Sequence, residues 1–162
     1  MFENEKNSTE QIIAEYEKEI MELSRFLPYL ESKKGVNVMS TYIPSGTNSG
    51  RQMGIPTYDS TLLSFVNYFK TSPHIDRNYM YVYSRYSIKG VADEYRMIER
   101  ARIQDMKIIY GILSRYIILG RTKGVVWKEG VENGIFYEAI SKMKELIEFW
   151  SLPFGQTDEK KE

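Results

Sequence analysis

The first stretch whose residue types could bind an anion is an Arg/Lys/Gly-rich turn at residues 120–134. Arg121 and Lys123 stand between glycines there, directly before a helical start at Val125-Val126-Trp127. The free backbone N–H groups at a helix start attract negative charge, and two cations beside them add to that attraction. The turn therefore predicts an anion site. The alternative is that the glycines cap helices and the cations offset a helix dipole, with no ligand involved.

A run of alternating tyrosines, 79–86, is the second stretch with chemical potential. Flat tyrosine rings stack on bases and other aromatic ligands, and arginine binds phosphate through paired N–H groups. Core packing is the simpler explanation of the tyrosines. Together, the two stretches supply what a nucleotide-like small molecule requires, namely ring faces and fixed cations. The candidate ligand-binding residues are Arg115, Arg121, Lys123, Trp127, Arg85, Tyr81, Tyr83 and Arg51.

No set of residues typical of catalysis stands out. The sequence has one His and no Cys, which excludes Cys–His catalysis and leaves His74 without a nucleophile elbow. The glycine-rich turn also lacks the spacing of a phosphate-binding loop. Asp93-Glu94 and the pair Glu129 and Glu132 are spaced like acids on solvated helix faces. We therefore expect no catalytic residue, no metal site and no cofactor.

Composition favours one cytoplasmic domain. The 162 residues carry 22 Lys plus Arg against 22 Asp plus Glu, so the overall charge does not favour bulk nucleic acid as a partner. The absence of cysteine points to a reducing compartment, and neither a signal peptide nor a membrane-spanning run is evident. We expect a single helical domain at 1–155, followed by a disordered charged tail at 156–162, in the cytoplasm of a bacterial host cell.

Helical periodicity dominates the chain. Ser8-Thr9-Glu10-Gln11 has the pattern of a capping box that begins an amphipathic helix, which Pro28 should kink or end. Asp59 or Ser60 should cap a second helix that ends before Pro73.

The later helices are expected at 92–119, with a break allowed near 102–105, and at 135–150. Residues 78–86 are compatible with a strand or a helix. The predicted fold is mainly α, a compact multi-helix single domain with one long Gly/Ser-rich loop or small hairpin at 35–58.

Several features follow one another in residues 105–150. A helix carries an Arg near its end, an Arg plus Gly turn comes next, then a Glu-x-Gly-Ile step and a final helix. This order resembles the C-terminal half of an uncharacterised family of small bacterial and phage helical domains of unknown function. The resemblance implies no activity. The residues it places in the motif are Arg115, Arg121, Gly124, Glu132 and Gly134.

Analogy with small phage proteins that act by binding leads to the functional hypothesis. We expect a non-enzymatic phage counter-defence protein that sequesters a nucleotide-derived immune signalling molecule. Apolar faces on the first and last helices favour a homo-oligomer. The alternative is a protein–protein inhibitor that occludes a host defence protein with its aromatic surface.

Overall fold

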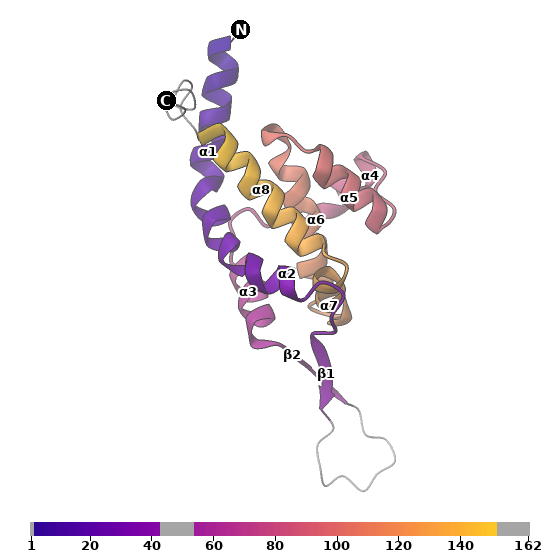
Figure 1. The fold of residues 1–162 in the computed structure, drawn as a ribbon. Helices are drawn as coiled ribbons and strands as arrows, with labels where there is room; N and C mark the ends of the chain where they lie inside the picture. The colour runs from indigo at the N-terminus through magenta and orange to yellow at the C-terminus, as the bar shows by residue number, and fades with distance from the viewer. Residues whose placement is uncertain (1, 43–53, 152–162) are drawn as a thin grey trace, which may run out of the picture.

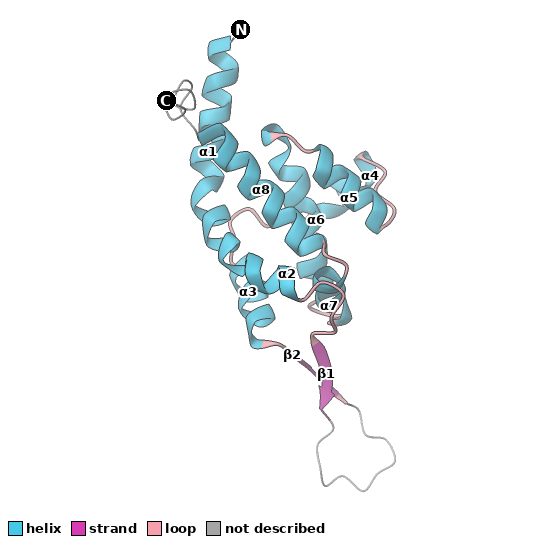
Figure 2. Ribbon diagram, in the orientation of Figure 1, coloured by secondary structure: helices cyan, strands magenta, loops and turns pink. Residues whose placement is uncertain are grey.

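The computed structural model describes residues 2–42 and 54–151, and helices account for most of them (Figure 2). The predicted mainly α fold with a small hairpin is confirmed. Helices from distant parts of the chain pack together, and the hairpin extends away from them (Figure 1). The elements in chain order are α1 (Phe2–Leu23), η1 (Ser24–Phe26), α2 (Leu27–Ser32), β1 (Met39–Tyr42), β2 (Ile55–Tyr58), α3 (Ser60–Lys70), α4 (Tyr79–Arg85), α5 (Val91–Arg100), η2 (Ile103–Asp105), α6 (Met106–Leu119), α7 (Val125–Glu132) and α8 (Ile135–Ser151).

Helix α6 is the centre of the core. It is apolar around most of its circumference, as expected of a helix that other helices enclose. It contacts α3, α4, α5, α7 and α8. Gly111 lets α4 approach closely, because a Cβ at this position would lie 2.9 Å from Cγ2 of Val82. The central helix thereby fixes α4, α5 and α7 around one site.

The N-terminal helices differ from the prediction in where they begin and break. Helix α1 starts at Phe2, so Ser8 lies inside it and the expected capping box is wrong. The Glu and Lys residues before Ser8 are good helix formers, which allows the helix to begin earlier. The chain changes direction at η1, before Pro28, and Pro28 lies in the first turn of α2. Proline is tolerated there because its missing N–H would have had no helical partner.

Other boundaries agree with the sequence. Helix α3 begins at Ser60 with Asp59 as its N-cap residue, and α8 covers the predicted last helix. The break expected near 102–105 is the turn η2 between α5 and α6, where the Asp105 carboxylate accepts a 2.9 Å hydrogen bond from the Arg102 N–H. The tyrosine run, left open between strand and helix, forms α4.

The hairpin pairs β1 with β2 in antiparallel register, with Met39 opposite Tyr58 and Tyr42 opposite Ile55. Tyr58 anchors its base, since its ring centroid lies 5.4 Å from that of Trp127. The rest of the predicted Gly/Ser-rich loop, including Arg51, and the predicted charged tail at 156–162 lie outside the described residues. Across the described ranges, no helix is both long enough and apolar enough to span a membrane.

Candidate functional site

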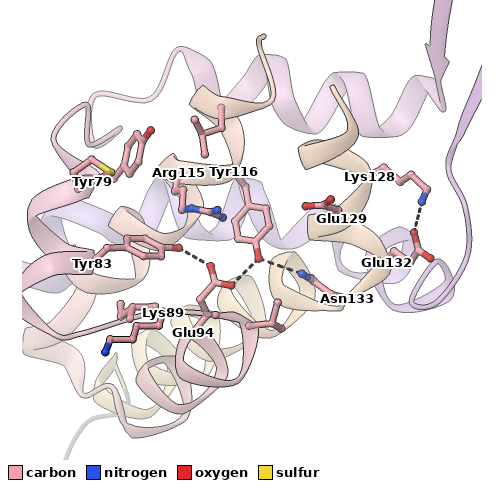
Figure 3. Close-up of a pocket in the computed structure, with 15 residues that line it drawn as sticks. Tyr79, Tyr83, Lys89, Glu94, Arg115, Tyr116, Lys128, Glu129, Glu132 and Asn133 are labelled. Carbon is pink, nitrogen blue, oxygen red and sulfur yellow. Dashed lines mark hydrogen bonds and ion pairs between the residues drawn. The ribbon is translucent and has the colours of Figure 1, made fainter. Parts of the chain in front are cut away.

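A pocket of about 870 Å³ lies between α4, α5, α6 and α7 (Figure 3). Its size is within the range of small-molecule sites. Tyrosine rings and aliphatic side chains form much of its wall, and charged side chains occupy its centre and rim. The residues that matter for its chemistry are Tyr79, Tyr83, Lys89, Glu94, Arg115, Tyr116, Lys128, Glu129, Glu132 and Asn133.

The floor of the pocket is a hydrogen-bonded carboxylate. Glu94 is only 2% exposed, and it accepts hydrogen bonds of 2.5 Å from the Tyr83 hydroxyl and 2.8 Å from the Tyr116 hydroxyl. The Tyr116 oxygen in turn accepts a 3.1 Å hydrogen bond from the Asn133 amide. A buried carboxylate is costly unless such donors satisfy it. The network therefore joins α4, α5, α6 and the end of α7 beneath the pocket.

The two tyrosines in this network keep their hydroxyl protons at neutral pH. Burial raises the pKa of Tyr83 and of Tyr116 above the ordinary value, and the negative charge of Glu94 and its hydrogen bonds raise both further. Both hydroxyls therefore remain protonated at neutral pH and remain hydrogen-bond donors to Glu94.

Arg115 is the central cation of the pocket. Its guanidinium carbon lies 5.4 Å from the ring centroid of Tyr83 and 5.4 Å from that of Tyr116, which is cation–π distance. Among the side chains described for residues 8–42 and 54–151, no carboxylate oxygen lies within 4.0 Å of this guanidinium, and the guanidinium donates no hydrogen bond to any of them. The two rings hold Arg115 in place while its donors stay available.

Charged residues of α7 form one rim of the pocket. Lys128 and Glu132, one helical turn apart, make an ion pair of 2.8 Å and so neutralise each other. The Glu129 side chain is exposed and lies across the Tyr116 ring from Arg115 (Figure 3). The pocket thus has a cation on one side and an acid on the other.

The sequence-predicted site residues separate into different places. Arg115 and Tyr83 line the pocket together. Arg121 and Lys123 are exposed on the turn between α6 and α7 and do not line it. Tyr81 and the nearby Arg85 lie on the exposed side of α4, outside the pocket, and the Arg85 guanidinium lies 5.8 Å from the Tyr86 ring centroid.

The backbone of the α6–α7 turn uses its own donors. The N–H groups of Arg121 and Lys123 donate to the carbonyls of Ile118 and Leu119, at 3.2 and 2.9 Å. The second and third amides of α7 also donate within the turn, from Val126 to the Lys123 carbonyl and from Trp127 to the Gly124 carbonyl. These bonds leave those amides without the free donors that an anion at a helix start requires.

Trp127 has a packing role. It is 8% exposed, and its indole N–H donates a 3.0 Å hydrogen bond to the Ile117 carbonyl. Gly120 makes room for the ring, because a Cβ there would lie 2.0 Å from the indole. Trp127 therefore fixes α7 against α6 and does not line the pocket.

Sequence reasoning missed Glu94, Tyr116 and Asn133 as site residues. The expectation that Glu94 lies on a solvated helix face is wrong, whereas its neighbour Asp93 is partly exposed and pairs with Arg96 at 2.9 Å. The available signal was position, since Glu94 lies one helical turn before the buried Ile98. An acid on the apolar stripe of a helix indicates a buried carboxylate with dedicated partners.

No family model, curated protein or solved structure matches the chain, as expected for a family of unknown function. The described residues also hold no group of three or more acids and histidines arranged to bind a metal ion. The geometry of the pocket is therefore the basis on which its function can be proposed.

Proposed function

We propose that the chain is a non-enzymatic binding protein that holds a small nucleotide-like anion in the pocket between α4, α5, α6 and α7. The observation that carries this proposal is the state of Arg115, whose guanidinium lies over two tyrosine rings with no acid within 4.0 Å among the described residues. A half-buried arginine with unused donors is suited to bidentate binding of a phosphate or carboxylate.

The walls of the pocket suit a flat ring. Tyr79 and Tyr83 meet edge to face with centroids 6.4 Å apart, and Ile88 and Leu119 contribute apolar surface to the same pocket. Aromatic and aliphatic walls with a few placed polar groups are typical of small-molecule sites. A nucleotide supplies both parts, an anionic phosphate for Arg115 and a planar base for the walls.

The pocket chemistry favours binding over catalysis. The carboxylate of Glu94 is occupied, since its two oxygens accept from Tyr83 and Tyr116. The raised pKa of each tyrosine makes it a poor general base at neutral pH. A ligand held without turnover is sequestered. We propose sequestration of a nucleotide-derived immune signal in a phage counter-defence setting as the biological role.

A protein-interaction role is the second candidate, and the outer face of α4 favours it. Tyr81 and Tyr86 are 57% and 40% exposed with Arg85 beside them, and Met80, which also lines the pocket, is 65% exposed. Tyr, Met and Arg are enriched at the centres of protein–protein interfaces. In this role the protein would occlude a host defence protein with α4.

Calorimetric titration and thermal unfolding with a panel of nucleotides and cyclic nucleotides test the proposal. Ligand binding to the folded state must raise the melting temperature. We expect at least one nucleotide to raise it and to be recovered chemically unchanged after heat denaturation. A panel without any stabilising nucleotide would contradict the binding role, and recovery of a cleaved product would contradict the non-enzymatic role.

A further inference from the structure

The charges that line the pocket are balanced. Three cations, Lys89, Arg115 and Lys128, face three acids, Glu94, Glu129 and Glu132. Lys128 and Glu132 neutralise each other at 2.8 Å. A ligand therefore meets no overall excess of positive charge, and each negative charge beyond the first adds repulsion from the acids.

Among these charged residues, a single one, Arg115, is placed to bind the anionic group of a ligand. The Lys89 side chain is exposed, and in Figure 3 its ammonium group points away from Arg115. Arg115 lies at the pocket centre, where its planar guanidinium presents paired donors. One guanidinium accommodates one phosphate group.

The acid opposite Arg115 is Glu129. It lies across the Tyr116 ring from Arg115, and the two side chains do not reach each other, since their charged atoms are more than 4.0 Å apart. Glu129 is exposed. A carboxylate in this position can accept hydrogen bonds from a donor group on the ligand and repels a second anionic group.

We infer that the pocket selects a ligand with a single negative charge and an amino group at its other end, as in a cyclic mononucleotide with an amino-bearing base. This inference rests on the proposed function. The phosphodiester of such a ligand binds Arg115, the base lies between the aromatic walls, and the amino group of the base donates a hydrogen bond to Glu129. A phosphomonoester carries between about one and a half and two negative charges and a triphosphate carries more, so both are disfavoured.

The first test compares 3′,5′-cyclic AMP, AMP and ATP by calorimetry on the full chain. We expect cyclic AMP to bind about tenfold or more tightly than ATP, with AMP between them. The reason is that the extra phosphate charges lie near the acids of the pocket, and repulsion between like charges a few ångströms apart near a protein surface is large enough to change the affinity by this factor. Equal or tighter binding of ATP overturns the charge selection while leaving the pocket as a nucleotide site. Failure of all three, and of every other nucleotide in the panel, overturns the proposed function itself.

The second test concerns Glu129. Cyclic inosine monophosphate lacks the amino group of cyclic AMP, so the wild-type chain should prefer cyclic AMP by about tenfold, the discrimination expected when a donor–acceptor pair is lost. Glu129→Gln should reduce that preference and raise the affinity for ATP. Glu17→Gln, an exposed acid of α1 outside the pocket, serves as the control and should change neither ratio. Unchanged ratios in Glu129→Gln overturn its assigned role.

Discussion

The Tyr116 hydroxyl and the Glu94 carboxylate are joined by a buried 2.8 Å hydrogen bond that ties α6 to α5 beneath the pocket. The same hydroxyl accepts from Asn133, the C-cap residue of α7, at 3.1 Å. Three successive helices of the chain, α5, α6 and α7, are thus linked through one oxygen atom. The position of Arg115, the residue before Tyr116, depends on this support.

Removal of the Tyr116 hydroxyl should destabilise the fold. Tyr116→Phe leaves the buried Glu94 with one donor fewer and leaves the Asn133 amide without its acceptor. Unsatisfied buried groups cost about 1–3 kcal/mol each, so we expect a loss of that order in the free energy of unfolding measured in urea. Tyr42→Phe, at a ring that is 57% exposed, is the control. A loss no greater than in this control would argue against the floor network.

Gly120 should tolerate no side chain. Its backbone is helical, with φ of −65°, so alanine is sterically allowed by the backbone itself, but the new Cβ would overlap the Trp127 indole. We expect Gly120→Ala to cost about 1–3 kcal/mol of stability and to shift the tryptophan fluorescence. Gly90→Ala is the matched control, because a Cβ at Gly90 meets nothing within 4 Å. Equal stability of the two variants would show that Trp127 does not pack as described.

The buried tyrosines should make the free energy of unfolding depend on pH in the alkaline range. Burial, followed by neighbouring carboxylates, raises the pKa of Tyr83, Tyr110 and Tyr116 above the ordinary tyrosine value of 10.0. The folded state then binds these protons more tightly than the unfolded state, so their contribution is full below pH 10.0 and is lost as the pH rises above it.

Two measurements check this pH dependence. Urea unfolding should give a free energy that falls steadily above the ordinary tyrosine pKa. Tyrosinate absorbance should appear at higher pH in the native protein than in the same protein unfolded in urea. Coincident titration curves for the native and unfolded protein would contradict the raised pKa values.

The helices were predictable where one physical pattern dominates. Helix α8 was predicted almost to the residue, since its apolar stripe ends near Pro153. The start of α1 was not, because a Ser-Thr-Glu pattern caps a helix only if the preceding residues do not themselves continue it. Residues 78–86 stayed ambiguous in sequence. They form a helix that packs on α6, and tertiary context of this kind is not visible in a local pattern.

The site was predictable only in part. Arg115 and Tyr83 were chosen for their types and lie together, but 32 positions of the sequence separate them and only the packing of α4 on α6 shows the contact. The spacing of Glu94 from Ile98 signals burial, but its partners could not be assigned from sequence, because the donors that make its burial tolerable come from α4 and α6. The α6–α7 turn was conspicuous in sequence, yet the amides of Arg121, Lys123, Val126 and Trp127 donate to nearby carbonyls.

The most direct test of the central claim is the nucleotide affinity of Arg115→Ala beside that of the double variant Arg121→Ala/Lys123→Ala, measured by calorimetry after circular dichroism has shown that both fold. Arg115→Lys is included because it keeps the charge and loses the paired donors. Charged hydrogen bonds contribute about 1.5–3 kcal/mol, so we expect a loss of affinity of at least about tenfold for Arg115→Ala, a smaller loss for Arg115→Lys, and unchanged affinity for the double variant. Retained affinity in Arg115→Ala with loss in the double variant would contradict the role of Arg115 and place the anion site on the α6–α7 turn.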